Sequence, residues 1–234
     1  MTSSTIPNPT KTQGILLLDK PEGKTSFYLV SVLRRLTGIK KIGHAGTLDP
    51  FATGVMVMLV GQNFTRLAEK FQNHDKAYRA TITLGIETDS YDIDGEIVAK
   101  SDKAPTLEEI HEVLTSFQGT VKQIPPMFSA KRQNGKKLYE LARQGLSVER
   151  EPKTVTIKTI LVDYEYPILT LDIDCTKGTY IRSIAHDIGQ MLGCGAFVSK
   201  LVRTRSGPFQ LQDCISLPPQ GSEFDYRQHL LCLP

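Results

Sequence analysis

Two neighbouring segments with strand-like patterns constrain the fold of this chain more than any other feature. Residues 155–162 read VTIKTILV and residues 168–175 read ILTLDIDC, and apolar side chains occupy every second position of the latter from Leu169 onward. Apolar residues that recur with a period of two are typical of a strand with one buried face. Because the connection is short, we expect the two strands to form a hairpin within a β-sheet.

Four other segments predict strands. Residues 78–84 alternate so that Tyr78, Ala80, Ile82 and Leu84 share one face. This alternation predicts a half-buried strand that begins at Tyr78. The remaining three are GILLL (14–18), VMVMLV (55–60) and EIVA (96–99), and the first two are apolar and short, as expected of buried strands.

Helical patterns lie between these strands. The first helix begins at a cap, Thr25 or Ser26, and ends near Gly38. Its expected core face is Phe27, Val30, Leu33 and Leu36. A capping box at 106–109 predicts a second helix through about residue 117, and a third spans roughly 137–144. The fourth begins with a cap at 178–179, and its apolar stripe is Ile181, Ile184, Ala185, Ile188, Met191 and Leu192.

Strand and helix patterns follow one another irregularly along the chain. This order favours an α+β protein, with a mixed sheet and helices packed on it. At 234 residues, 40% of them hydrophobic, the chain is long enough to bury a core. We expect a disordered lead-in over residues 1–13, one folded domain over 14–208 and a short tail over 209–234.

Basic residues gather in three windows that contain no acidic residue. RRLTGIKK (34–41), KRQNGKK (131–137) and KLVRTR (200–205) hold eleven Lys and Arg, although the whole chain has a net charge of only +3. If the fold brings the windows to one face, they form a positive groove for a polyanion such as a nucleic acid. Any single window would fit an ordinary solvated surface equally well.

Several classes of site lack their usual sequence signals. Four widely spaced cysteines without a CxxC pair indicate neither a zinc site nor a disulfide framework, which fits a reducing cytoplasm. The polar start MTSSTIPNPTKTQG has no signal-peptide pattern, and no apolar run approaches the ~20 residues of a membrane span. Motifs of nucleotide-cofactor enzymes, zinc hydrolases and serine hydrolases are absent as well.

One carboxylate, Asp49, stands among small residues in GHAGTLDPFATG (43–54). Asp before Pro commonly starts a turn or caps a helix, which is a structural interpretation. Glycines on either side also let another molecule approach the backbone closely, so the same carboxylate is a candidate catalytic group. On this stretch alone the structural interpretation is favoured.

Five segments together resemble the TruB family of tRNA pseudouridine synthases. They are DKPEGKTS, GHAGTLDPFATG, DKAYRATITLG, IPPMFSAKRQNGKKLYELARQG and KGTYIRSIAHDIG, and the resemblance covers residues 14 to about 207. It implies the pseudouridine synthase fold, with a mixed, mostly antiparallel central sheet, flanking helices and a central active-site cleft. It also implies an isomerase that converts uridine 55 in the TΨC loop of tRNA to pseudouridine without a cofactor or a metal.

The same resemblance implies the partners of the chain. The expected partner is the T-arm stem-loop of tRNA. We expect a cytoplasmic monomer that needs no protein partner and does not bind a membrane.

Three residues carry the chemistry that this resemblance implies. Asp49 matches the catalytic aspartate, which attacks C1′ or C6 or removes a sugar proton, and the sequence does not distinguish these paths. Tyr78 matches the residue that stacks on the flipped base and helps to remove the C5 proton, although its strand pattern equally fits a core tyrosine. Arg182 matches the arginine that pairs with the catalytic carboxylate. Because a helix start disfavours a cation, Arg182 is expected to have a tertiary partner rather than a plain surface position.

Four further positions match the family's site. His44 matches the histidine that fills the space left by the flipped base. Tyr180 and Leu201 match substrate-pocket positions, and Asp92 matches a position in the charge network of the site. Taken alone, a loop histidine, a tyrosine beside a helix cap and a leucine in a strand would each fit a structural role.

The chain departs from the family in two ways. Phe128 stands where members commonly carry a tyrosine, so a hydrogen bond from that hydroxyl is lost. We also expect no C-terminal PUA domain, so that tRNA binding depends on the basic windows and is sensitive to salt. Two alternatives stay open: a non-catalytic tRNA-binding or tRNA-folding protein, and the catalytic subunit of a guide-RNA particle, which would depend on partner proteins.

Overall fold

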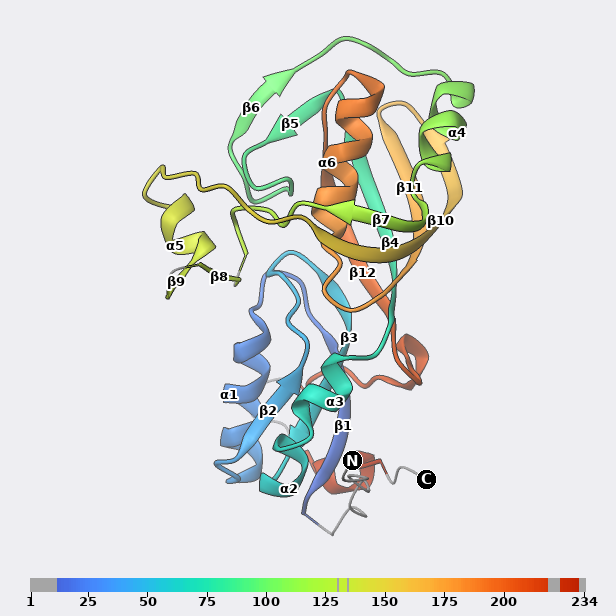
Figure 1. Ribbon diagram of the computed structural model, residues 1–234. Coiled ribbons are helices and arrows are strands. Elements are labelled where there is room, and N and C mark those ends of the chain that lie inside the picture. Colours follow the sequence, from blue (N-terminus) through green and yellow to red (C-terminus); the bar gives the residue numbers. More distant parts are fainter. Residues whose placement is uncertain (1–11, 130, 134, 219–223, 232–234) are drawn as a thin grey trace. The chain divides into compact units, whose positions relative to one another are not determined.

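The computed structural model describes residues 12–129, 131–133, 135–218 and 224–231. Most of the predicted lead-in, parts of the predicted tail and Cys232 therefore lie outside the described residues. The chain divides into two compact units (Figure 1): the first ends at Ala77 and resumes at Val202, and the second spans Tyr78–Leu201. Strands β4 (Lys76–Leu84) and β12 (Ala196–Ser206) cross these boundaries.

Strand β3 (Thr53–Val60) is the central strand of the first unit. It pairs antiparallel with β1 (Gly14–Lys20) from Gly14↔Val60 to Lys20↔Gly54. It also pairs antiparallel with β2 (Ile42–Ala45) and parallel with Val202 and Arg203 of β12. Strand β13 (Phe209–Gln210) pairs antiparallel with the end of β12. With neighbours on both edges, β3 is buried from Gly54 onward, which explains its continuous apolar run.

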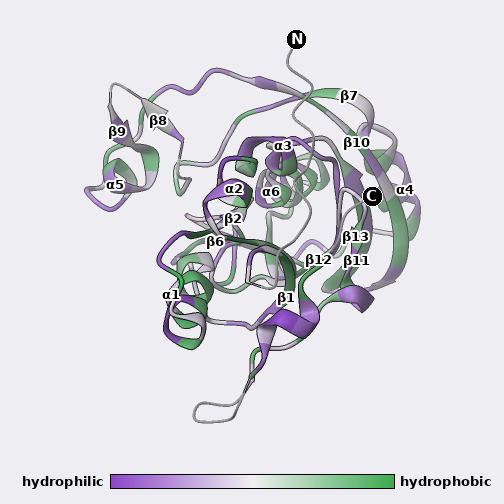
Figure 2. Cartoon of the chain, turned by 90° about the horizontal axis from the view of Figure 1, so that it is seen from below, coloured by the Kyte–Doolittle hydropathy of each residue, from purple (hydrophilic) through white to green (hydrophobic). Residues whose placement is uncertain are grey.

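Helix α1 (Ser26–Thr37) has the predicted ends but a different buried face. Thr25 caps it by accepting a hydrogen bond from the backbone N–H of Tyr28, and Gly38 ends it in a left-handed conformation. Phe27, predicted for the core, is 60% exposed, whereas Ser26 is buried. The inward face is shifted because the Ser26 hydroxyl bonds with the backbone of Leu48. Figure 2 shows α1 with both hydrophobic and hydrophilic residues along its length.

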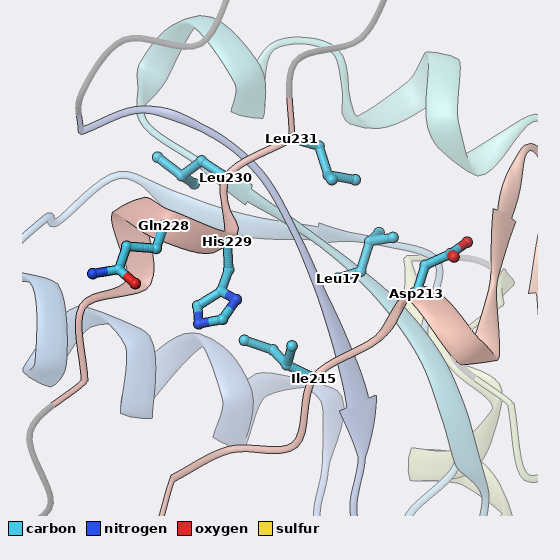
Figure 3. A pocket seen from close by; sticks show the side chains of 7 residues that line it. All are labelled: Leu17, Asp213, Ile215, Gln228, His229, Leu230 and Leu231. Carbon is cyan, nitrogen blue, oxygen red and sulfur yellow. The ribbon is translucent and has the colours of Figure 1, made fainter.

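The C-terminal segment of the first unit runs along β1. Ile215 accepts a hydrogen bond from Asp19 N–H (2.9 Å) and donates one to Leu17 O (3.1 Å), and Leu231 donates to Ile15 O (2.8 Å). A pocket lies between this segment and β1, and its lining residues are Leu17, Asp213, Ile215, Gln228, His229, Leu230 and Leu231 (Figure 3). The short helices of the first unit are α2 (Gln62–Thr65), α3 (Ala68–Gln72), η1 (Leu211–Asp213) and η2 (Tyr226–His229).

The second unit contains the predicted hairpin. Strands β10 (Lys153–Glu165) and β11 (Ile168–Cys175) pair antiparallel from Ile157↔Cys175 to Glu165↔Ile168. The strand order in this unit is β12-β4-β11-β10-β7, where β7 is Gln118–Gln123. Strand β4 alternates between buried and more exposed residues as predicted, with Tyr78, Ala80, Ile82 and Leu84 buried.

Helix α6 (Ile181–Leu192) supplies much of the core of the second unit. The predicted cap at 178–179 is wrong, because Tyr180 is the N-cap and Gln123 bonds to its backbone instead. The predicted stripe is buried except for Met191, which is 54% exposed near the helix end. Helix α4 (Leu107–Thr115) has the predicted capping box and ends before residue 117. The remaining elements are β5 (Ile86–Thr88), β6 (Ile97–Lys100), β8 (Arg132–Gln133), β9 (Lys136–Lys137) and α5 (Leu138–Ala142).

The predicted α+β class with a mixed sheet is confirmed. Strands β2 and β7 were not predicted, because neither segment has a clear alternation of buried and exposed residues. Within the described ranges, no helix combines the length and the apolar character that a membrane span requires.

The close approach of β3 and β12 makes a prediction about Gly54. Its φ is 101°, and a Cβ added there would lie 2.3 Å from the carbonyl oxygen of Arg203. An alanine at this position would have an unfavourable positive φ, and its Cβ would force the backbone of β3 or β12 to move. We therefore expect Gly54→Ala to lower the free energy of unfolding by about 3 kcal/mol or more. Urea titration measures the loss.

Gly38→Ala is the matched control for this prediction. Gly38 also has a positive φ, 71°, but no atom lies within 4 Å of an added Cβ. Its loss is expected to be about 1–2 kcal/mol, the cost of the left-handed conformation alone. Equal losses in the two variants would contradict the close approach of the two strands.

Candidate active site

Asp49 lies in the first unit, on the loop between β2 and β3. The Asp49 carbonyl accepts a hydrogen bond from Ala52 N–H (3.2 Å), so the residue does begin a turn, as the structural interpretation predicted. Asp49 is half-buried. The turn is compatible with the catalytic interpretation, because the hydrogen bond that closes it joins backbone groups.

Ser26 holds the residue before Asp49. Its side chain is buried, and its hydroxyl accepts a hydrogen bond from Leu48 N–H (2.9 Å) and donates one to Leu48 O (3.0 Å). Ser26 is the first residue of α1, so the start of this helix is tied directly to the loop. Both backbone polar groups of Leu48 are thereby satisfied without regular secondary structure.

Lys20 holds the residue after Asp49. Its side chain is fully buried at the end of β1 and donates to the carbonyl oxygens of Pro21 (2.9 Å) and Pro50 (3.0 Å), and also to that of Lys24. Burial lowers the pKa of Lys20 to about 8; the attraction of Asp49 opposes this decrease, and the Arg203 guanidinium adds to it. The buried Lys20 amine thus stabilises the loop through hydrogen bonds. It also interacts electrostatically with Asp49.

Arg203 holds the first part of the loop. It is 1% exposed, and its guanidinium donates to the carbonyl oxygens of Val55 (2.7 Å), Gly46 (3.3 Å) and Thr47 (3.4 Å). The prediction that the window 200–205 belongs to a basic surface is therefore wrong for Arg203. Because its donors bind backbone carbonyls inside the protein, this arginine does not face a nucleic acid.

His44 lies on β2, in the same unit as Asp49. Burial lowers the pKa of its imidazole, and the charge of Arg203 lowers it further. Both effects favour the neutral ring at pH 7. A neutral, partly buried imidazole is compatible with the predicted space-filling role, which stays a prediction.

In the second unit, Arg182 lies in the first turn of α6 and is 4% exposed. Its Nη1 lies 3.0 Å from Asp92 Oδ2 and donates to Ser90 O (3.0 Å), and its Nη2 donates to Phe128 O (2.8 Å). The expected tertiary partners therefore exist, and Asp92 is one of them. Because Phe128 contributes its backbone carbonyl, this contact does not require the tyrosine hydroxyl that the position lacks.

Asp92 is itself held by its own turn. It is 5% exposed, and its Oδ1 accepts hydrogen bonds from the Ser90 hydroxyl (2.5 Å) and from Asp94 N–H (3.1 Å). These hydrogen bonds fix the direction of the Asp92 carboxylate. Asp92 and Arg182 thus form a buried ion pair in which each side chain also makes further hydrogen bonds.

The remaining predicted residues lie in the second unit too. Tyr78 on β4 is 9% exposed, and Leu201 at the unit boundary of β12 is 5% exposed. The Tyr180 N–H donates to Gln123 Oε1 (2.8 Å), and its carbonyl accepts from Gln123 Nε2 (2.9 Å). The structure thus groups Asp49 with His44 in one unit and Tyr78, Tyr180, Arg182 and Leu201 in the other. The predicted pairing of Asp49 with Arg182 stays a prediction.

Sequence reasoning missed the residues that hold the Asp49 loop: Lys20, Ser26 and Arg203. One available signal was the lysine two residues after the buried strand at 14–18, directly before the turn residues PEG. Arg203 has no comparable local signal, because its partners lie about 150 positions away in sequence. Among the described residues, no group of three or more His, Cys, Asp or Glu side chains is arranged to hold a metal ion.

Comparison with known proteins assigns the family. The profile of the TruB family pseudouridylate synthase N-terminal domain matches residues 34–181, and that of the tRNA pseudouridylate synthase B C-terminal domain matches residues 182–218. The chain belongs to the TruB family. Pseudouridine synthases are isomerases, so membership identifies the class of reaction.

Relatives of this TruB-family chain include two from chlamydial bacteria. The tRNA pseudouridine synthase B of Protochlamydia amoebophila is 60% identical over 208 residues, which cover 89% of this chain and 79% of the relative. That of Chlamydia felis is 61% identical over 203 residues, which cover 87% and 86%. A chain in the crystal structure of a Cbf5-Nop10-Gar1 complex is 27% identical with a TM-score of 0.72. The match covers 95% of this chain but only 60% of that one, and it supports the pseudouridine synthase fold.

The buried position of Lys20 predicts a pH dependence of stability. Its folded-state pKa of about 8 lies below the unfolded value of 10.5. Between these values the unfolded state binds more protons, so stability should rise with pH in this window. We expect wild type to gain stability relative to Lys20→Met as the pH increases from 8 to 10.5, measured by urea unfolding at each pH.

Lys24→Met removes an exposed lysine and controls for the loss of one positive charge. A constant difference between wild type and Lys20→Met across this pH range would contradict the prediction.

Proposed function

We propose that this chain isomerises uridine 55 in the TΨC loop of tRNA to pseudouridine. The observation that carries the proposal is 60–61% identity, over 87–89% of the chain, to two tRNA pseudouridine synthases B. The position of the target uridine comes from the resemblance of the five sequence motifs to the family. The fixed geometry around Asp49 supports the proposal.

The reaction places clear demands on the protein. The bond between N1 of uracil and C1′ of the ribose breaks, the uracil rotates, and C5 forms a new bond to C1′. The proton lost from C5 is balanced by the proton gained at N1. The uracil must stay enclosed throughout, because its escape would leave an abasic site. Since the target nucleotide lies in a folded RNA loop, it must first be flipped out of its stack.

Asp49 is the proposed catalytic carboxylate. Attack at C1′, attack at C6 and removal of a sugar proton all require a carboxylate held in one direction. The hydrogen bonds of Ser26 to Leu48 and of Lys20 to Pro50 restrict the backbone on both sides of Asp49. Such support lowers the cost of orienting the carboxylate during the reaction.

The other site residues are proposed to handle the flipped base and the carboxylate. Tyr78 would stack on the uracil and help to remove the C5 proton, and His44 would occupy the space that the base leaves. Tyr180 and Leu201 would line the substrate pocket. Arg182 would pair with Asp49. The support for these roles is the match of each position to the family's motifs.

The exposed face of α1 is a proposed contact for the T-arm. Residues 24–48 contain no Asp or Glu. Phe27 is 60% and Tyr28 39% exposed, and Arg34 and Arg35 are exposed on the same helix. Basic groups interleaved with aromatic rings bind phosphates and stack on bases. The end of this face overlaps the predicted basic window 34–41. The face would act in a monomeric enzyme that needs no protein partner.

The two alternatives are less well supported. A guide-RNA-particle subunit would draw on the likeness to the Cbf5 complex, but that identity is 27% against 60% for the tRNA pseudouridine synthase of Protochlamydia. A non-catalytic RNA-binding protein has no need for a carboxylate on a loop whose backbone is held on both sides. We still propose one catalytic domain over residues 14–208, of which the two compact units are parts.

The enzyme proposal predicts tritium release that depends on Asp49. Wild type should release tritium from tRNA labelled at C5 of uridine, and Asp49→Asn should lower the rate by about 10³-fold or more, because the reactive oxygen is lost. Asp163→Asn, an exposed aspartate on β10, is the matched control and should keep the wild-type rate.

A second substrate tests the position of the uridine. A tRNA with cytidine at position 55 should release no tritium. Release from that tRNA would refute the assignment of the site. Intact binding without any release by wild type would instead favour the non-catalytic alternative.

The α1 face predicts how RNA affinity depends on salt. Replacing both Arg34 and Arg35 with alanine should weaken T-arm binding and make the slope of log K against log salt shallower by about 1–2, because up to two phosphate contacts are lost. Fluorescence anisotropy at several salt concentrations measures both effects. Arg227→Ala, an exposed arginine in the C-terminal segment, should leave the slope unchanged. An unchanged slope in the double variant would exclude this face as a contact.

A further inference from the structure

Tyr91 has an unusual backbone conformation for a large side chain. Its φ is 65°, and it is the sole non-glycine residue with a positive φ in the described part of the chain. Crowding of Cβ disfavours this left-handed region for every residue except glycine, and bulky residues occupy it rarely. A strained conformation persists where surrounding contacts compensate for it, and such residues cluster at functional sites.

The contacts of this turn converge on one face of α6. Ser90 O and the Asp92 carboxylate hold Arg182, as described above. Between them, the Tyr91 ring stacks on the His186 imidazole, with the ring centroids 3.9 Å apart and the planes 15° from parallel. Positions 182 and 186 are one helical turn apart and therefore share a face. Ser90, Tyr91 and Asp92 thus contact two successive turns of α6.

Neighbouring residues fix both members of the stack. His186 Nδ1 lies 3.4 Å from Glu87 Oε1, and Gln190 Nε2 donates to Glu87 Oε2 (2.8 Å), so Glu87 lies against two successive turns of α6. The Tyr91 carbonyl accepts a hydrogen bond from Val198 N–H (3.0 Å) on β12. The strained residue is therefore held through its ring and through its backbone.

We propose that the Tyr91–His186 stack is a positioning element that keeps the turn 90–92 in its strained conformation and thereby holds Arg182 in place for the isomerisation. A glycine at position 91 would adopt the same φ without strain but could not supply the ring. The inference rests on the proposed function, because it concerns the orientation of Arg182. Tyr91 and His186 act through Arg182 and are not assigned contacts with the substrate.

Substitutions at position 91 separate strain from stacking. Tyr91→Phe keeps the ring and should leave kcat within about twofold of wild type. Tyr91→Gly removes both the ring and the strain, so the melting temperature should change little. Its kcat should nevertheless fall by about tenfold or more, because Arg182 is no longer held. The Kd for T-arm RNA should stay unchanged, whereas a purely structural role would change stability and leave kcat intact.

Substitutions on the helix give a second test. His186→Phe preserves an aromatic ring for stacking and should retain kcat, whereas His186→Ala should show the loss seen in Tyr91→Gly. His229→Ala is the matched control, because it removes another stacked pair, Phe224–His229, in the first unit. That variant should keep the wild-type kcat. A similar loss in all three histidine variants would overturn the proposal.

A double-mutant cycle tests whether the stack acts through the ion pair. In an Asp92→Asn background, where Arg182 has already lost its charged partner, Tyr91→Gly should lower kcat little further. If the loss of kcat in the double variant equals the product of the losses in the two single variants, Tyr91 acts independently of Arg182, and the proposal is overturned.

Side-chain NMR measures the orientation of Arg182 without catalysis. Wild type should show a slowly exchanging guanidinium N–H signal, assigned by its loss in Arg182→Lys. The signal should persist in Tyr91→Phe and broaden in Tyr91→Gly, and an unchanged signal in Tyr91→Gly would contradict the inference. If wild type makes no pseudouridine, the proposed function fails, but this NMR comparison still decides the role of the stack.

Discussion

Buried cations that donate to backbone carbonyls hold together the irregular parts of this protein. Lys20 and Arg203 bind carbonyl oxygens on both sides of the Asp49 turn, and Arg182 binds carbonyls of two separate loops. Burying a charge is costly unless its polar atoms are satisfied. A lysine has three donors and an arginine five, so one side chain can satisfy several carbonyls that have no partner in a helix or sheet. These hydrogen bonds restrict the conformation of the Asp49 loop.

The same chemistry explains why the loops of the two units differ in character. The backbone of the Asp49 loop is held by buried cations and by Ser26. The 88–92 turn carries its own carboxylate, Asp92, inward to a buried arginine. In one loop the acidic group is the proposed reactive centre, and in the other it is part of the support. A carboxylate therefore has to be judged by what surrounds it and not by its turn sequence.

Sequence patterns predicted the elements whose formation depends on local periodicity. The alternation in β4, the β10–β11 hairpin and the capping box of α4 were all visible in the sequence. The face of α1 was not, because a hydrogen bond to Leu48 turns Ser26 inward and leaves Phe27 exposed. Asp49, Tyr78 and Arg182 are predicted site residues that rest on family motifs. The roles of Lys20 and Arg203 were missed, because backbone carbonyls leave no mark in a sequence and lysine and arginine are usually exposed.

The C-terminal segment beside β1 has a consequence for how the molecule behaves among copies of itself. The outer strand of a sheet presents backbone donors and acceptors that another chain can pair with, which is a common route to aggregation. Here Ile15, Leu17 and Asp19 already bond to Leu231 and Ile215 through these groups. At those positions the edge of the sheet is closed by the protein's own chain. Folding and resistance to aggregation are thus linked, because the segment that completes the first unit also prevents other copies of the protein from pairing with β1 at these positions.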